Sequence, residues 1–222
     1  MRGAFSALFL AVASAGSAMA GAPSVSEQAG AIEYRDGAGV ARSLARGAEF
    51  SEPVLSPDGR TVAFIRADSA AASDENPPTS LWLADGPSGK LRRLLASRRS
   101  DDVKANLASF HHPLFSLDGH FIYVSADAWA TSPAVHQVNV ATGAERFVID
   151  GGVVALIRTG PLRGYLLVRR HKYHPAPRYG SYDPIYVVRP DAKEMLVVPG
   201  TDLDDDKDHL APWLQAKGWR AW

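Results

Sequence analysis

Two stretches of the chain carry the same order of apolar and polar positions. Each opens with proline and two apolar residues, passes through serine and an Asp-Gly pair, and ends in alternating apolar positions; these are Pro53–Phe64 and Pro113–Val124. Ser56, Pro57 and Gly59 hold the first, second and fourth positions favoured in a type I turn. Each stretch therefore predicts a β-hairpin, and the apolar residues on both faces of its second strand predict burial on both sides.

A second hairpin follows each first one, so the pattern predicts four short strands per repeat. The first repeat adds strands at 81–84 and 91–95, and the second adds 135–140 and 145–149. A more divergent third copy supplies 153–157, 165–168, 185–188 and 195–198. Four short strands in each repeat of roughly 50 to 60 residues are typical of a propeller blade.

The motifs of the first repeat resemble a known family. The runs Ser56-Pro-Asp-Gly59, Val62-Ala-Phe64, Leu81-Trp-Leu83 and Gly89-Lys-Leu-Arg-Arg-Leu94 are similar to the blade repeat of TolB-type β-propellers. The same repeat builds the N-terminal propellers of prolyl-oligopeptidase-like enzymes. The resemblance covers about residues 48–199 and implies an all-β, propeller-like fold of about three four-stranded blades. It says little about function, because such folds serve many tasks.

Three blades do not close a ring, because propellers usually have about four or more. The N-terminal segment 21–47 offers one strand, Ala31–Arg35, and the segment 200–222 predicts a helix. Three arrangements are open: a small four-bladed ring, an open arc with capped ends, or an assembly completed by a partner. We expect the open arc.

The C-terminal helix is predicted to cap the last blade. Asp208 is the expected N-cap and Gly218 the expected left-handed end, which places Pro212 at the fourth position. Leu210, Trp213 and Leu214 make an apolar face, which Trp219 and Trp222 extend. Packing on the blade is the simpler interpretation, and a tail that docks on a partner is the alternative.

Residues 1–20 have the three parts of a secretory signal. Met1-Arg2 is followed by an apolar run and by Ala18-Met19-Ala20, the small-x-small pattern that signal peptidase recognises. No other segment approaches the length that spans a bilayer. We expect cleavage near Ala20 and a periplasmic or secreted protein with no stable membrane span.

Composition excludes several classes of function. The 24 basic and 24 acidic residues balance, which argues against nucleic acid as a partner, and the absence of cysteine excludes disulfides and thiolate metal sites. The acidic run Asp202-x-Asp204-x-Asp206 lacks the glycine and glutamate of an EF-hand, and no Gly-x-Ser-x-Gly elbow occurs. We therefore expect no catalytic residues, no cofactor and no bound metal.

The candidate ligand site is a basic and aromatic insertion in the third repeat. Its residues combine forked guanidinium donors with flat aromatic surfaces: Arg170, His171, Tyr173, His174, Arg178, Tyr179 and Tyr182. The strand order places this insertion on the same face of the arc as Trp129, His111 and His112, a surface that we call the loop face. In the alternative interpretation, the insertion folds into the gap of the absent blade, and its tyrosines belong to the core.

These features predict an exported, non-enzymatic binding module that engages a protein or cell-envelope ligand through the loop face, with self-association possible. The alternative is a propeller fragment or accessory part of an exported prolyl-oligopeptidase-like peptidase.

Overall fold

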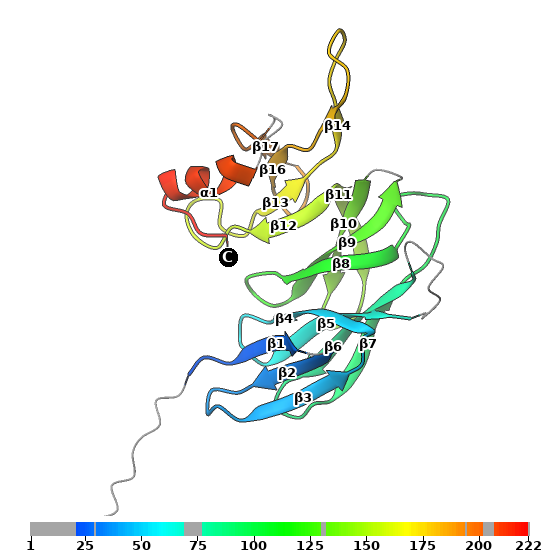
Figure 1. Ribbon diagram of the computed structural model, residues 1–222, viewed down its shortest axis with the longest axis vertical. Helices are drawn as coiled ribbons and strands as arrows, with labels where there is room; N and C mark the ends of the chain where they lie inside the picture. The colour runs from blue at the N-terminus through cyan, green and yellow to red at the C-terminus, as the bar shows by residue number, and fades with distance from the viewer. Residues whose placement is uncertain are drawn as a thin grey trace, which may run out of the picture.

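The computed structural model describes residues 21–28, 30–68, 77–129, 132–193, 195–201 and 207–221. The predicted signal peptide, its cleavage site near Ala20, the acidic run 202–206 and Trp222 lie outside the described residues. The strands form a series of antiparallel sheets that follow one another along the chain, with the helix at the end (Figure 1).

Three four-stranded sheets correspond to the three predicted repeats, and in each the strands pair in chain order. Blade 1 contains β4 (Phe50–Leu55), β5 (Thr61–Ala67), β6 (Thr79–Asp85) and β7 (Leu91–Ala96). Blade 2 contains β8 (Ala108–Phe115), β9 (Phe121–Trp129), β10 (Ser132–Asn139) and β11 (Glu145–Asp150). Blade 3 contains β12 (Gly152–Leu156), β13 (Leu166–Arg169), β16 (Ile185–Val188) and β17 (Met195–Val197). The predicted all-β fold and its blade strands are confirmed.

The turn in the first hairpin is held by its own side chains. The Ser56 hydroxyl donates to the Asp58 carboxylate and accepts the backbone N–H of Thr61, with 2.8 Å between the latter N and O atoms. Gly59 has φ of 73°, a left-handed conformation that glycine adopts without a steric penalty. The second repeat forms the same bonds at Ser116, Asp118 and Phe121, so this short motif suffices to make the turn.

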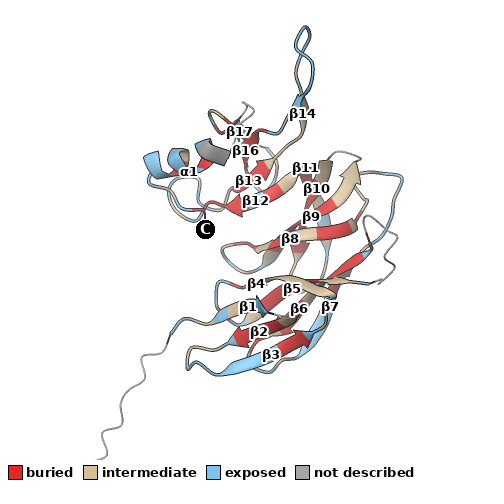
Figure 2. Cartoon of the chain, viewed as in Figure 1, coloured by how far each residue is buried: buried red, intermediate tan, exposed pale blue. Residues whose placement is uncertain are grey.

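The sheets stack face to face, and each interface is an apolar core (Figure 2). Along β5, Val62 and Phe64 face the N-terminal sheet, whereas Ala63 and Ile65 face blade 2. All four are buried, which confirms the prediction that this strand is covered on both sides. A further core joins blades 2 and 3, and a last one joins blade 3 to the helix.

The N-terminal segment forms a complete small sheet, where the sequence predicts one strand. Its members are β1 (Ser24–Gln28), β2 (Ala31–Arg35) and β3 (Ala41–Arg46). Ile32 and Tyr34 of β2 are buried against blade 1, and the Tyr34 hydroxyl donates to the carbonyl of Gly59 at 3.0 Å. β1 has no buried residue and β3 has only two, so the apolar alternation that marks a strand is weak in both.

The helix α1 (Lys207–Ala216) packs on blade 3 through Leu210 and Leu214, as predicted. It ends in a left-handed Gly218, with the Trp219 N–H bonded to the Leu214 carbonyl at 2.9 Å, the geometry of a Schellman motif. Trp219 stands edge-on to Trp213 at 5.4 Å between ring centroids. The helix thus covers the last blade.

The start of the helix differs from the prediction. It begins at Lys207, so Asp208 is the second helical residue instead of the N-cap, and Pro212 is the sixth residue instead of the fourth. At that position the missing proline N–H removes one helical hydrogen bond. The packing of α1 on blade 3 compensates for this loss, because tertiary contacts supply most of the stability of a short helix.

Both ends of the stack are covered. The face of the N-terminal sheet that points away from blade 1 carries polar, exposed residues such as Ser24, Ser26 and Ser43, and α1 closes the opposite end. The blades therefore form an open arc with capped ends, which was the preferred of the three predicted arrangements. Among the described helices, none is both long and apolar enough to cross a bilayer.

Candidate functional site

The innermost strands of blades 1 and 2 share an irregularity that shapes the loop face. Glu52 in β4 and His112 in β8 each precede a proline and have φ of 53° and 52°. Each lies at a shift in the strand register. Proline lacks the N–H that a regular ladder requires, so the extra residue forms a β-bulge and its side chain is turned out of the sheet.

The bulges are joined from sheet to sheet. The Glu52 N–H donates to the Glu27 carboxylate at 3.2 Å, and the His112 N–H donates to the Glu52 carboxylate. Between blades 2 and 3, the Val153 N–H donates to the Ser125 hydroxyl at 2.9 Å. Two glutamates thus hold neighbouring inner strands together, and Glu52 brings negative charge to His111 of blade 2.

His111 forms an ion pair across β8 and β9. Its Nε2 lies 3.4 Å from Oδ1 of Asp127, and both side chains are partly exposed. The hydrogen bond with Asp127 raises the pKa of His111, with help from the charges of Asp127 and Glu52, while burial opposes the shift. The ring is therefore protonated more readily than an ordinary histidine.

A groove of about 370 Å³ lies between blades 2 and 3 on this face. Its polar lining consists of His111, His112, Ser125, Asp127 and Arg169, and Val154 and Pro133 contribute apolar surface. The mixture of hydrogen-bond donors and one carboxylate suits a polar ligand that carries both acceptor and donor groups. Within the described part of the chain, no three histidine or acidic side chains are grouped to hold a metal ion.

The predicted insertion forms a hairpin that extends away from the stack (Figure 1). Its strands are β14 (Lys172–Tyr173) and β15 (Ser181–Tyr182), paired in a sheet of their own. Tyr173 and Tyr179 are 69% and 91% exposed. The interpretation that these tyrosines fill a gap in the core is therefore wrong, because the arc is already covered at both ends and leaves no gap for them.

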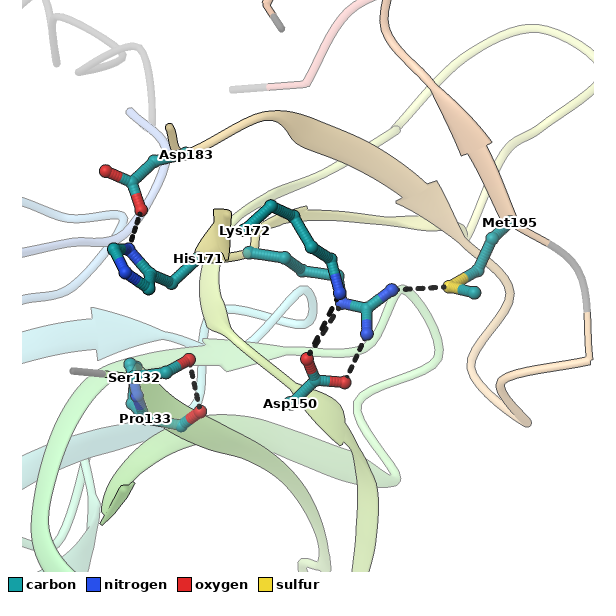
Figure 3. Close-up of polar contacts among 8 residues, drawn as sticks. Ser132, Pro133, Asp150, His171, Lys172, Asp183 and Met195 are labelled. Atoms are coloured by element: carbon teal, nitrogen blue, oxygen red, sulfur yellow. Dashed lines mark hydrogen bonds and ion pairs between the residues drawn. The ribbon is translucent and has the colours of Figure 1, made fainter. Parts of the chain in front are cut away.

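The root of the hairpin is tied to blade 2 through Asp150 (Figure 3). Arg170 donates to both carboxylate oxygens, with Nε 3.2 Å from Oδ2, and Lys172 Nζ lies 3.8 Å from Oδ2. The Arg170 side chain is largely buried, its third nitrogen contacts the Met195 sulfur at 3.3 Å, and it lies over the Tyr186 ring. Arg170 therefore positions the hairpin, and its donors are engaged inside the protein.

Ring contacts stiffen the hairpin further. His171 bonds to the Asp183 carboxylate at 2.8 Å (Figure 3). Its ring also stands edge-on to Tyr173, with ring centroids 5.0 Å apart. His174 stacks on Tyr182 at 4.4 Å. These contacts fix the base of the hairpin and leave Tyr173, Tyr179 and Arg178 exposed.

The structure divides the predicted site residues between two places. His111 and His112 line the groove, while the seven residues of the insertion form the hairpin and its root. Trp129 lies half-buried at the end of β9, opposite Ser132. The sequence did not single out Asp127 or Asp150, because each lies in or at the end of a strand where only the pairing of distant segments gives it a role.

Comparisons with known proteins point to the fold. No protein-family model matches the chain, and no curated protein matches it in sequence. Solved structures do: tricorn protease at 13% identity and a TM-score of 0.53, and Kuenenia stuttgartiensis hydrazine synthase at 15% and 0.53. A putative TolB from Agrobacterium tumefaciens matches at 15% and 0.50.

The chain has a β-propeller fold. It is 81% covered by the first two matches and 75% by the third, and it spans 16%, 51% and 55% of those chains. The propeller of this chain is thus about half the length of the TolB and hydrazine synthase chains that it matches. The resemblance to TolB-type and peptidase propellers is confirmed at the level of the fold.

Proposed function

We propose that this chain is an exported, non-enzymatic propeller module that binds a protein partner through the hairpin of its loop face. The observation that carries the proposal is the exposure of Tyr173 and Tyr179 on a hairpin whose root is anchored by Asp150. Tyrosine and arginine are enriched among the residues that dominate binding energy at protein interfaces.

The anchoring supports this function physically. An interface residue held in place before binding loses less conformational entropy when the partner arrives. The ion pairs of Arg170 and Lys172 with Asp150, together with the His174–Tyr182 stack, provide this rigidity. The exposed rings supply apolar area with a hydroxyl at the rim, which suits a surface that is solvated when free.

The histidine–carboxylate pairs favour a structural over a catalytic role. His111 pairs with Asp127, His136 with Glu145, and His171 with Asp183. In a nucleophilic triad the second ring nitrogen would meet a hydroxyl. No hydrogen bond between a histidine ring and a serine or threonine hydroxyl occurs in the described ranges.

The second candidate function is a propeller part of an exported peptidase. It is favoured by the fold that this chain shares with the propeller-containing tricorn protease. The two candidates differ in what the hairpin meets, since a peptidase accessory would hold a hydrolase domain there and a binding module would hold a separate ligand protein.

The experiment is site-specific photo-crosslinking from the tip of the hairpin in the full-length chain. A benzophenone amino acid replaces Tyr179, and a matched probe replaces the exposed Lys90 on the opposite face. We expect a discrete crosslinked adduct with a partner protein from the probe at position 179 and none from the probe at position 90. An excess of unlabelled wild-type protein should compete and abolish this adduct. An excess of the Tyr173→Ser/Tyr179→Ser double variant should not abolish it. Equal adducts from both probes, or equal competition by the double variant, would contradict the proposal. A hydrolase in the adduct would favour the second candidate.

A further inference from the structure

The junction between blades 2 and 3 has a cavity on the face opposite the hairpin, which we call the turn-face cavity. Its volume is about 570 Å³, against about 300 Å³ for the corresponding cavity between blades 1 and 2. Leu117, Phe121, Leu156 and Pro190 give it apolar walls. Its size falls in the range of small-ligand pockets, about 300–1,000 Å³.

The repeats show that this junction is specialised. Strand pairing aligns Tyr123 with Ala63 and Gln137 with Leu83, because each pair of residues lies opposite one another in its own blade. In blade 1 these positions are apolar and belong to the core. In blade 2 they are polar, although Tyr123 and Gln137 are only 3% and 8% exposed. Burial of polar groups is unfavourable without partners, so this pair requires a physical reason.

The hydrogen bonds of the pair have a fixed direction. Arg146 Nε donates to Gln137 Oε1 at 2.7 Å, and because a guanidinium is only a donor, the amide orientation of Gln137 is determined. Gln137 Nε2 then donates to the Tyr123 hydroxyl oxygen at 3.1 Å. The Tyr123 O–H must therefore donate elsewhere. No described residue accepts it, and Tyr123 lines the turn-face cavity.

A guanidinium lies on the wall of the same cavity. Arg163 is exposed and forms no side-chain ion pair or hydrogen bond with the residues that the structure describes. The cavity also has one carboxylate, Asp118, which is occupied by the Ser116 hydroxyl and the His120 N–H; these bonds hold its pKa below the usual value. Arg163 is therefore the one cation among the residues that line this cavity, since Arg146 is bonded to Gln137 and to the Pro190 carbonyl.

We infer that the turn-face cavity binds a ligand that carries a carboxylate on an apolar body. The carboxylate accepts the Tyr123 O–H and the Arg163 guanidinium, and the apolar body packs on Phe121 and Leu156. A carboxylate satisfies both donors, and donor chains that end on an anion are stronger than isolated bonds. This site is separate from the hairpin and is tested independently of it.

The experiment is calorimetric titration of the full chain with hexanoate, hexanamide and hexylammonium. We expect hexanoate to bind with a dissociation constant on the order of 1 mM, and the amide and the amine at least about tenfold more weakly, since they lack the charge that the two donors recognise. N-acetyl-leucine is a second arm. Tighter binding of this compound identifies a peptide carboxyl terminus as the natural ligand, and tighter binding of hexanoate identifies a small aliphatic acid.

The variants Tyr123→Phe and Arg163→Gln test the donors separately. Each should weaken hexanoate binding about tenfold, because one hydrogen bond to a charged group is removed. Arg158→Gln, in the same loop but outside the cavity, and Tyr179→Phe, on the hairpin, should leave binding unchanged. Arg163 is exposed, so its variant keeps the test valid if Tyr123→Phe alters the core. Equal affinity for acid and amide, full affinity in both variants, or no saturable binding of either acid would overturn the inference.

Discussion

The carboxylate of Asp150, at the end of blade 2, receives two hydrogen bonds from the guanidinium of Arg170, at the root of the hairpin in blade 3. The chain therefore fixes its most exposed segment to the neighbouring blade, across an interface whose core is apolar. The hairpin is held by the stack of blades and does not depend on its own two short strands.

Asp150→Asn should destabilise the protein, because Arg170 is largely buried and would lose its only carboxylate partner among the described residues. We expect a loss of about 1–3 kcal/mol in the free energy of unfolding, measured by urea titration. The control is Asp191→Asn, whose ion pair with Arg189 lies at the surface within one turn. There the change should be much smaller, because exposed ion pairs contribute little to stability. Equal effects in the two variants would show that Asp150 is no anchor.

Alanine at two equivalent turn glycines should have unequal effects. Gly59 and Gly119 both have φ of 73°, where an added Cβ costs about 1–2 kcal/mol. At Gly59 the new Cβ would also lie 2.9 Å from Pro23 Cγ, whereas at Gly119 the nearest atom is 3.6 Å away. Gly59→Ala should therefore lower the melting temperature further than Gly119→Ala. The bulkier valine should disrupt both hairpins, and a near-normal melting temperature for both valine variants would contradict the blade assignment.

His136 should make stability fall at acidic pH. It is fully buried, and burial lowers its pKa although the Glu145 carboxylate opposes the shift. Because the unfolded chain binds the proton more readily, stability is complete above about pH 6.5, the pKa of an unperturbed histidine, and decreases as the pH falls below it. His136→Gln should reduce this pH dependence in urea titrations between about pH 5 and 7.5.

His111 should act in the opposite direction. Its pKa is raised by Asp127, so its contribution to stability is present below about pH 6.5 and is lost as the pH rises through the folded pKa. His111→Gln should therefore remove a gain in stability that the wild type shows as the pH falls through the folded pKa toward about 6.5, measured in the same urea titrations. If His136→Gln and His111→Gln changed the pH dependence of stability in the same direction, the environments of the two histidines would not be as described.

The solution mass should be that of one chain. The outer face of the N-terminal sheet is polar and α1 covers most of blade 3. The apolar surface left at the described ends is the short strand β17, which is too small a patch to drive stable association. Light scattering over a concentration series should give a constant mass. A mass that increases with concentration would show that the blades complete one another between chains.

The blades can be predicted from the local sequence pattern. A strand is marked by apolar and polar positions that alternate with a period of two residues. The Ser-x-Asp-Gly turn is closed by hydrogen bonds within six residues. Both features are therefore visible in a short stretch of sequence. The hairpin is also recognisable from the sequence, because its basic and aromatic composition differs from that of the strands around it.

The contacts between these elements depend on how the whole chain folds. β1 and β3 are weakly patterned and become strands by pairing with β2 on blade 1. Asp150 acquires its role from Arg170, 20 residues later, and the donor chain from Arg146 to Tyr123 crosses three strands. Such contacts depend on which strands become neighbours and in which register. That outcome follows from burial of the whole stack, and no short stretch of sequence encodes it.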